Sequence, residues 1–214
     1  MRMIFLGPPG SGKGTQAKKL CGKFKLAHIS TGDILRKAIK DETELGKRAG
    51  SYVDSGDLVP DDIILGMIKE ELTGNSSGFI FDGFPRTPAQ AEGLEKLLKN
   101  LGMSLDRVIN LRVDDRAIIE RLVARRLCKS CGFEYNLKTR PPQKDGICDR
   151  CGGELFQRSD DNAEVINNRL SVYREKTRPI EDFYRARGLL VDVDGGQGFE
   201  EVFDSIVEMV GSAS

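Results

Sequence analysis

A glycine-rich segment directly after a short apolar run constrains the fold of this chain more than any other feature. The segment GPPGSGKGTQ, residues 7–16, follows MIFL, residues 3–6, and sets Gly7, Gly12 and Lys13 at the spacing G-x4-G-K. We expect MIFL to form a strand and a helix to follow the glycines, which is the context of a phosphate-binding loop. Glycines let backbone N–H groups converge on anionic oxygens, the helix N-terminus adds positive potential, and Lys13 adds a full charge. The prolines hold the entry to the loop rigid.

The segment departs from the strict phosphate-loop pattern at one position. That pattern has Ser or Thr directly after the lysine, whereas this chain has Gly14 there and Thr15 next. The hydroxyl that usually binds Mg²⁺ is therefore displaced by one residue. A glycine turn with a purely structural role is the alternative, but the joint presence of strand, loop, helix and lysine disfavours it.

Short apolar runs alternate with helical patterns along the chain. GFIFD (78–82), RVINLRV (107–113) and LLVDV (189–193) are nearly continuously apolar, which favours strands buried on both faces, and AHIS (27–30) is a weaker candidate. Alternating strands and helices predict an α/β fold, a five-stranded parallel sheet flanked by helices. The helical spacing is carried by Ala17, Leu20, Cys21, Phe24, Ile118, Ile119, Leu122, Val123, Phe199, Val202, Phe203, Ile206 and Val210.

Two segments interrupt this alternation. Residues 30–59 are polar and helical in pattern with no predicted strand, and residues 126–161 contain two cysteine pairs, RPP and GG. A chain of 214 residues suits one ordinary domain with small insertions. We therefore interpret both segments as insertions into a single α/β core.

The composition excludes several classes of protein. Hydrophobic residues make up 39 % of the chain, and 33 Lys and Arg balance 33 Asp and Glu, so no bulk charge draws the protein to nucleic acid or membranes. No apolar run approaches the roughly 20 residues of a membrane span. MIFL is too short for the core of a signal peptide. We expect a cytoplasmic protein.

The cysteine pairs have the spacing of a four-thiolate metal site. Cys128 and Cys131 are separated by two residues, as are Cys148 and Cys151, with sixteen residues between the pairs. Four thiolates close the coordination shell of zinc, so the metal would be structural rather than catalytic. The spacing specifies the ligands better than the metal, which leaves iron or cobalt open. Free or disulfide-bonded cysteines are the alternative, which a reducing compartment disfavours.

Other residues have simpler interpretations. A zinc ribbon often binds nucleic acid, but the acidic residues of the insertion offset its Lys and Arg. We expect Cys21 to pack in the core and His28, the only histidine, to be an ordinary structural residue outside every motif. Thr31 is predicted to cap the helix that begins at TGDILR.

Asp82 and Arg86 stand in DGFPR, residues 82–86, directly after a predicted strand. Ligands of open α/β sheets bind at the carboxyl ends of strands, so we expect both side chains beside the phosphate loop. Further arginines lie scattered in short polar contexts, and a single surface arginine is usually only a solvated charge. They are Arg36, Arg125, Arg158 and Arg169.

Taken together, these motifs resemble the adenylate kinase family over essentially the whole chain. The resemblance is carried by GPPGSGKGTQ, ISTGDILR (29–36), DGFPRTPAQA (82–91), RLVARR (121–126) and QRSDDN (157–162). Gly14 followed by Thr15 is the usual form of the loop in this family. The four-cysteine insertion is similar to the zinc-containing, long-lid branch common in bacteria. The resemblance implies the reaction ATP + AMP ⇌ 2 ADP, with Mg²⁺ accompanying ATP and a structural Zn²⁺.

The resemblance also implies roles for individual residues. Lys13, Arg86, Arg125, Arg158, Arg169 and Asp82 would be catalytic, Arg158 and Arg169 bridging the reacting phosphates and Asp82 holding Mg²⁺ through waters. ATP would bind Gly10, Ser11, Gly12, Lys13, Gly14, Thr15, Arg121, Arg125, Glu134, Tyr135 and, through its backbone, Gln197. AMP would bind Thr31, Arg36, Asp57, Leu58, Val59, Gly83, Phe84, Pro85, Arg86, Gln90, Arg158 and Arg169. The metal ligands would be Cys128, Cys131, Cys148 and Cys151.

The same resemblance implies a division of the chain and its partners. Residues 1–29, 60–125 and 162–214 would form the core, 30–59 the AMP-binding insertion and 126–161 the lid. We expect a monomer that binds ATP, AMP and ADP and neither nucleic acid nor membranes. Another nucleoside monophosphate kinase, for UMP/CMP or GMP, and a zinc-ribbon nucleic-acid-binding P-loop protein are the alternatives. Two further alternatives remain open. Asp160 and Asp161 could support the catalytic geometry or only form ion pairs, and Gln90 could be a solvated helix residue that does not bind AMP.

Overall fold

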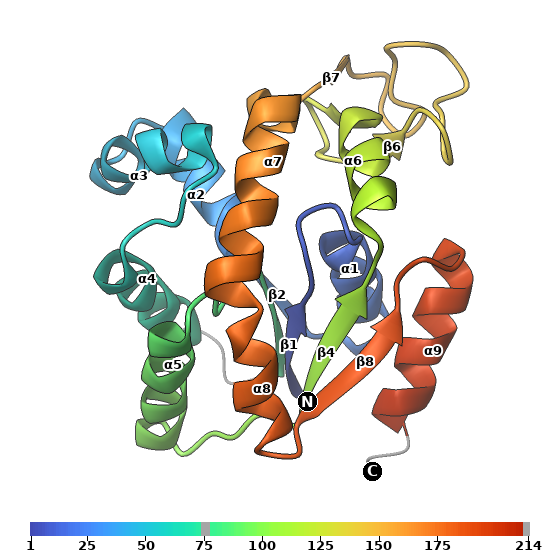
Figure 1. The fold of residues 1–214 in the computed structure, drawn as a ribbon. Helices are drawn as coiled ribbons and strands as arrows, with labels where there is room; N and C mark the ends of the chain where they lie inside the picture. The colour runs from blue at the N-terminus through green and yellow to red at the C-terminus, as the bar shows by residue number, and fades with distance from the viewer. Residues whose placement is uncertain (74–77, 212–214) are drawn as a thin grey trace.

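The predicted apolar runs form a parallel sheet at the centre of the molecule (Figure 1). The computed structural model describes residues 1–73 and 78–211, and within them five parallel strands pair in the order β2-β3-β1-β4-β8. Phe5 pairs with Asp82 and Leu6 with Asn110, so the carboxyl ends of neighbouring strands meet at one edge. The strands are β1 (Arg2–Leu6), β2 (Ala27–Ser30), β3 (Phe79–Asp82), β4 (Arg107–Arg112) and β8 (Leu190–Asp194).

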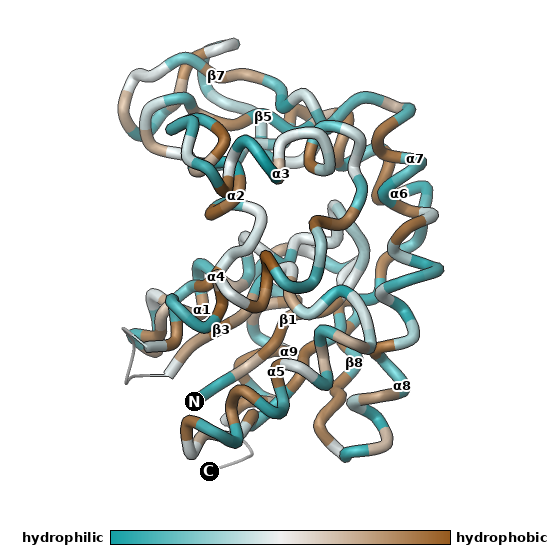
Figure 2. The backbone as a smooth tube through the Cα atoms, turned by 90° about the vertical axis from the view of Figure 1, so that its left-hand side faces the viewer, coloured by the Kyte–Doolittle hydropathy of each residue, from teal (hydrophilic) through white to brown (hydrophobic). Residues whose placement is uncertain are grey.

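The side chains of each strand alternate between two apolar layers. In β1, Met3 and Phe5 join the layer formed with α1 (Lys13–Phe24) and α9 (Phe199–Gly211). Ile4 and Leu6 join the opposite layer, which includes α4 (Asp61–Thr73), α5 (Pro88–Asn100) and α8 (Pro179–Arg185). Figure 2 shows apolar segments along β1 and the neighbouring helices. The predicted burial of the sheet on both faces is confirmed.

The segment 30–59 is helical, as its pattern predicts. It contains α2 (Thr31–Lys40) and α3 (Glu44–Ser55), which pack against each other at one side of the sheet (Figure 1). The prediction that Thr31 caps α2 is wrong: Ser30 is the N-cap residue, and its hydroxyl accepts from the N–H of Asp33 at 3.3 Å. Thr31 instead begins the helix and donates its hydroxyl to the carbonyl oxygen of Gly83 at 2.8 Å.

The cysteine-containing segment forms a small antiparallel sheet away from the core. After α6 (Asp115–Val123) the chain runs through β5 (Arg125–Cys128), β6 (Glu134–Asn136) and β7 (Leu155–Phe156), which pair in the order β6-β5-β7. It returns through a 3₁₀ turn, η1 (Ser159–Asp161), into α7 (Ala163–Val172), and the π-helical η2 (Tyr173–Thr177) connects α7 to α8. The buried side chains of this segment form a separate cluster of Cys128, Tyr135, Cys148 and Leu155.

The helical spacing correctly located α6 and α9, but it did not separate all of their buried apolar residues from the exposed ones. Ile118 and Leu122 of α6 are fully buried, whereas Ile119 and Val123 are exposed, as is Phe199 at the start of α9. Among the described residues, no helix is both long enough and apolar enough to cross a membrane.

Candidate functional site

The glycine-rich loop leaves the start of α1 open to an anion. Gly12 is the N-cap residue with φ 93°, a left-handed conformation that glycine adopts without strain, and no side chain of the described residues caps the helix there. Lys13 Nζ donates to the carbonyl oxygens of Gly7 and Pro8, both at 2.7 Å, and so lies over its own loop. Desolvation in this site lowers the pKa of Lys13 to about 7, against the attraction of Asp82, and the charges of nearby arginines lower it further.

The position of Asp82 explains why glycine follows the lysine. A Cβ atom at residue 14 would lie 3.0 Å from Asp82 Oδ2, closer than ordinary van der Waals contact. A side chain at this position would push the Asp82 carboxylate away by a few tenths of an ångström. The absence of a side chain at Gly14 therefore leaves room for Asp82 beside the loop. The place of Asp82 directly after β3 predicts this position.

His28 lies closer to this site than the sequence indicates. Its Nε2 is 3.5 Å from Asp82 Oδ2, and its contact and charge help to hold the pKa of Asp82 below its usual range, against a desolvation that raises it. We expected an ordinary structural residue outside every motif. The parallel pairing of β2 with β3 brings the two side chains together, and no local pattern in the sequence could have signalled that contact.

Three predicted arginines form a buried cluster with two aspartates. Arg125 holds Asp161 through two hydrogen bonds, Nε to Oδ2 at 2.8 Å and Nη2 to Oδ1 at 2.6 Å. Arg158 binds Asp160 in the same two-pronged way, and Arg169 Nη1 lies 3.1 Å from Asp160 Oδ2 and 3.6 Å from Asp161 Oδ1. Such paired contacts fix the plane of a guanidinium group. The cluster connects β5, η1 and α7 at the two ends of the cysteine-containing segment.

The charges of this cluster are mutually stabilised. Burial would raise the pKa of Asp160, but its hydrogen bonds to Arg158 and the charges of Arg158, Arg169 and Arg125 lower it to about 2. Burial together with the neighbouring arginines lowers the pKa of Arg169 to about 10, which leaves it charged at neutral pH. The cluster carries three positive and two negative charges, so it retains a net charge for an anion.

Asp161 is fully buried beside Arg125, so we expect the Asp161→Asn variant to lose about 3 kcal/mol of unfolding free energy, because Arg125 then keeps a buried charge without its carboxylate. Urea unfolding followed by circular dichroism measures the change. The matched control is Asp115→Asn, which breaks the half-exposed ion pair with Arg174 and should cost less than about 1 kcal/mol. Equal losses in the two variants would contradict the prediction.

A pocket lies between α2, α3, the segment after β3 and the arginine cluster. Most of the residues predicted for AMP line it, and Arg169 and Asp160 form its boundary with the cluster. Phe84 is not among them, since it is fully buried in the apolar core against Phe81. Pro85 and Arg158 are also outside the lining. The lining residues are Thr31, Gly32, Leu35, Arg36, Val53, Gly56, Asp57, Leu58, Val59, Ile64, Gly83, Arg86, Gln90, Asp160 and Arg169.

Gln90 lines this pocket, and both the oxygen and the nitrogen of its amide form hydrogen bonds within the protein. Its Oε1 accepts from the backbone N–H of Arg86 at 2.7 Å, and its Nε2 donates to Asp61 Oδ1 at 2.7 Å. Gln90 is buried, so the alternative of a solvated helix residue is wrong. Asp61 lies outside every motif of the sequence, and its carboxylate fixes the orientation of this amide.

The residues predicted for the donor nucleotide are less closely grouped. Arg121 Nη1 donates to the carbonyl oxygen of Gly195 at 2.9 Å, which connects α6 to the loop that carries Gln197. Gln197 and Glu134 are exposed. Tyr135 is buried and points its hydroxyl into the cysteine cluster, 3.5 Å from Cys148 Sγ. Glu134 is near enough for its charge to help raise the pKa of Arg125, against burial and together with the bond to Asp161.

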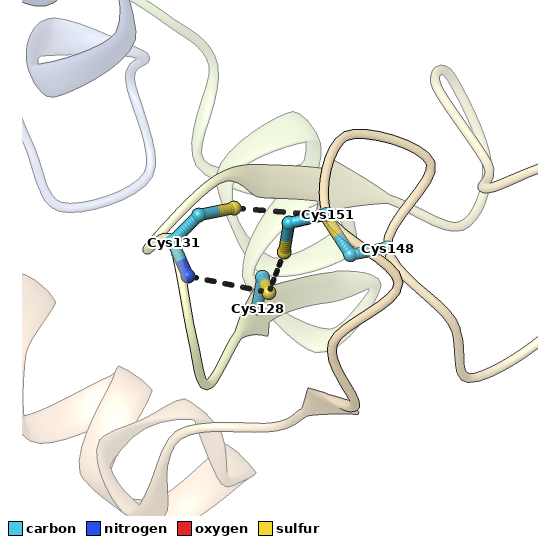
Figure 3. A group of neighbouring side chains, drawn as sticks. All are labelled: Cys128, Cys131, Cys148 and Cys151. Carbon is cyan, nitrogen blue, oxygen red and sulfur yellow. Dashed lines mark hydrogen bonds between the residues drawn. The ribbon is translucent and has the colours of Figure 1, made fainter.

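The four cysteines of the two pairs converge on one point (Figure 3). Their sulfur atoms all lie within 4.8 Å of one another, with Cys128 and Cys151 at 3.4 Å and Cys131 and Cys148 at 3.6 Å. Tetrahedral zinc at about 2.3 Å from each sulfur requires sulfurs about 3.8 Å apart, so this group fits such an ion. The remaining cysteine, Cys21, is buried on α1 as predicted.

Comparison with known proteins identifies the family. The sequence model of the family described as adenylate kinase matches residues 5–189. The chain belongs to the adenylate kinase family. It is 50 % identical to the adenylate kinase of Bacillus licheniformis over 213 residues, which cover 99 % of this chain and 98 % of that protein. It is 52 % identical to the adenylate kinase of Caldicellulosiruptor bescii over 212 residues, covering 98 % and 97 %.

An archaeal relative matches to the same extent as the bacterial ones. The adenylate kinase of Archaeoglobus fulgidus is 50 % identical over 208 residues, 96 % of each chain. The coverage leaves no room for either segment, 30–59 or 126–161, to lie outside the similarity. Membership in the adenylate kinase family confirms the resemblance inferred from the motifs, and the five-stranded α/β core confirms the predicted fold.

Proposed function

We propose that this protein transfers the γ-phosphoryl group of ATP, bound with Mg²⁺, to AMP and so produces two ADP, and that it thereby contributes to adenine nucleotide homeostasis. The observation that carries the proposal is the arginine cluster between the phosphate loop and the pocket bordered by α2 and α3. Arg86, Arg125 and Arg169 are close enough to Lys13 for their charges to lower its pKa. Arg86 and Arg169 also line the pocket. Positive charge is thus concentrated where two sets of phosphates would meet.

On the donor side, the phosphates of ATP would bind the loop and the open start of α1. The residues that we assign to ATP are Gly10, Ser11, Gly12, Lys13, Gly14, Thr15, Arg121, Arg125, Glu134, Tyr135 and Gln197. Asp82 would hold Mg²⁺ through waters, because its carboxylate borders Gly14 at the end of β3. Oxygen ligands and retained waters are what Mg²⁺ prefers beside phosphates.

On the acceptor side, AMP would occupy the pocket beneath α2 and α3. Arg36 and Arg86 offer guanidinium groups there, and Gln90 offers an oriented amide at the pocket wall. To these we add Thr31, Asp57, Leu58, Val59, Gly83, Phe84, Pro85, Arg158 and Arg169, with Phe84 acting through its backbone, since its side chain is buried in the core.

The reaction needs charge and position rather than a general base. The second pKa of a phosphate monoester is about 6, so AMP is mostly a dianion at neutral pH and can attack without losing a proton. Phosphoryl transfer spreads negative charge over the equatorial oxygens, and guanidinium groups that bind two oxygens at once stabilise that charge. We assign this role to Lys13, Arg86, Arg125, Arg158 and Arg169. Arg158 and Arg169 would bridge the two nucleotides.

Closure of the two insertions would keep water from accepting the phosphoryl group. We propose that residues 1–29, 60–125 and 162–214 act as the core, 30–59 as the AMP-binding insertion and 126–161 as the lid. The arginines at both ends of the lid support this division, because Arg125 and Arg126 stand where the lid begins, and Arg158 would move with the lid over the nucleotides. The lid has a small core of its own. A structural Zn²⁺ held by Cys128, Cys131, Cys148 and Cys151 would make it rigid.

We further propose that the protein acts as a monomer in the cytoplasm. A monomer suffices because the donor loop, the acceptor pocket and the arginine cluster all belong to one chain. Sedimentation of the protein at micromolar concentration tests the oligomeric state.

Binding of Mg·ATP at pH 8 is expected to take up about 0.9 proton per site. Lys13, with a pKa of about 7, is mostly neutral at that pH in the free protein, and the phosphates would raise its pKa and restore its charge. Calorimetric titrations in buffers of different ionisation enthalpy measure the uptake. The Lys13→Met variant should show none, and a binding enthalpy independent of the buffer would contradict the assignment.

Phosphoryl transfer from Mg·ATP to AMP, GMP, CMP and UMP tests the proposed function directly. Strong preference for AMP with ADP as the only product supports it. Preference for another monophosphate would retain the mechanism and overturn the proposed specificity for AMP. Failure to transfer to any of them, from folded and metal-loaded protein, would favour the nucleic-acid-binding alternative, for which salt-dependent binding to RNA or DNA is the measurement.

A further inference from the structure

Gln16, on the first turns of α1, makes a contact that neither the motifs nor the proposed mechanism uses. Its side chain is buried, and its Nε2 donates to the backbone carbonyl oxygen of Phe199 at 2.9 Å. The two residues are 183 positions apart in sequence. The orientation of the amide is settled by chemistry, since a carbonyl oxygen can only accept and the facing atom must be the NH₂ group.

Phe199 ends the loop that carries Gln197. The same loop is held at its other end by the bond from Arg121 to the carbonyl oxygen of Gly195 and by the bond from the Gly195 N–H to the carbonyl oxygen of Arg112 at 2.8 Å. Residues 196–198 between these anchors are exposed. The loop is thus fixed at both ends and open in the middle, with the phosphate-loop helix providing one anchor and α6 and β4 the other.

We propose that Gln16 is a positioning residue for the donor nucleotide, which sets the loop of residues 195–199 at a fixed distance from the phosphate loop. This inference rests on the proposed function, in which that loop contacts ATP through the backbone of Gln197. Because the phosphates are assigned to the glycine-rich loop, we assign Gln197 to the nucleoside end of ATP. A nucleotide triphosphate has a fixed span from phosphates to base. The bond from Gln16 to Phe199 directly connects the helix that follows the phosphate loop with the loop assigned to the nucleoside. The two subsites are therefore correctly spaced before ATP binds, which reduces the entropy lost when the loop is ordered on binding.

The effect of removing this bond is simple to interpret. Gln16 Oε1 is buried and has no hydrogen-bond partner among the described residues, so the amide contributes this one side-chain bond. The Gln16→Met variant approximately keeps the length and shape of the side chain, and it removes the donor together with an amide oxygen that has no partner. The carbonyl of Phe199 then loses its bond to α1, and the loop end is held only by α9.

The test compares Mg·ATP with Mg·tripolyphosphate, which presents the phosphates without a base. In calorimetric titrations, Gln16→Met should weaken binding of Mg·ATP about threefold to tenfold and leave binding of Mg·tripolyphosphate unchanged. In steady-state assays the KM for ATP should rise by a similar factor, with kcat and the KM for AMP unaltered. A purely structural role of Gln16 would not separate the two ligands in this way.

The matched control is Lys23→Met, two turns further along α1. Lys23 also faces α9, with its amine 5.9 Å from the ring centre of Phe203, and it makes no described contact with residues 195–199. This variant should bind both ligands like the unmodified protein. Thermal melting of both variants verifies that they are folded.

The remaining outcomes overturn the proposal. Equal weakening for both ligands would mean that Gln16 acts through the phosphate loop, and unchanged affinity for both would mean that the bond to Phe199 positions nothing. The binding measurement needs no turnover. Failure of the proposed reaction would therefore appear as absent transfer to AMP in the unmodified protein, separately from the ligand comparison.

Discussion

Replacement of Lys13 by methionine is expected to lower kcat for phosphoryl transfer by about 10³-fold or more, the largest effect of any single change in this protein. Lys13 is the one lysine that bonds the loop carbonyls of Gly7 and Pro8, and it is surrounded by the charges of Asp82, Arg86 and Arg169. When ATP binds, the amine would move from these carbonyls to the phosphates. Methionine has no charge with which to stabilise the negative charge that develops on the transferred phosphoryl group. Coupled assays of ADP formation at saturating ATP and AMP measure the loss.

The control for this variant is Lys23→Met on the same helix. Lys23 lies in the last turn of α1, with its amine 5.9 Å from the ring centre of Phe203, far along the helix from the loop. Its replacement should leave kcat unchanged within about twofold. Near-normal turnover of Lys13→Met, in protein that melts like the unmodified chain, would refute the assignment of the loop.

Removal of the metal is expected to lower the melting temperature by about 10 °C or more before it affects turnover in the cold. The segment of residues 126–161 buries few side chains, so the bonds from four sulfurs to one ion would provide most of its rigidity. Calorimetric melting of protein before and after chelation, with the released ion counted by a colorimetric indicator, measures the effect. Re-addition of Zn²⁺ should restore the original melting temperature.

Cys21→Ala provides the matched control for the metal. Cys21 is the one cysteine outside the cluster, buried on α1, and its removal should leave the zinc content at one ion per chain. Replacement of Cys148 by serine, which removes a buried ligand, should lower both the zinc content and the melting temperature. An unchanged melting curve after verified loss of the ion would argue against a structural metal.

The arginine cluster holds positive charge in a partly buried place by pairing each guanidinium with an aspartate. Arg158 and Arg169 share Asp160, and Arg125 holds Asp161, so each guanidinium is neutralised in part and fixed in orientation. Asp160 and Asp161 thus form ion pairs that also fix the orientation of the arginines. Support of the catalytic geometry by these two aspartates stays a prediction.

The local signals of the sequence determined most of the fold. The apolar runs located all five strands of the core sheet, because a strand buried on both faces is recognisable from its own residues. The glycine loop and the cysteine spacing likewise act over a few residues each. The resemblance carried by these motifs led to the adenylate kinase family, which the comparisons confirm.

Contacts between distant segments were decided only by the tertiary structure. The spacing of helical residues in TGDILR could not tell whether Ser30 or Thr31 caps α2, since the choice depends on the Gly83 carbonyl 52 residues away. The approach of His28 to Asp82 depends on the pairing of β2 with β3, and the bond from Gln16 to Phe199 depends on the packing of α1 against α9. Such bonds join single atoms across the chain and leave no periodic trace in the sequence, whereas burial and turn formation repeat over neighbouring residues and can be recognised there.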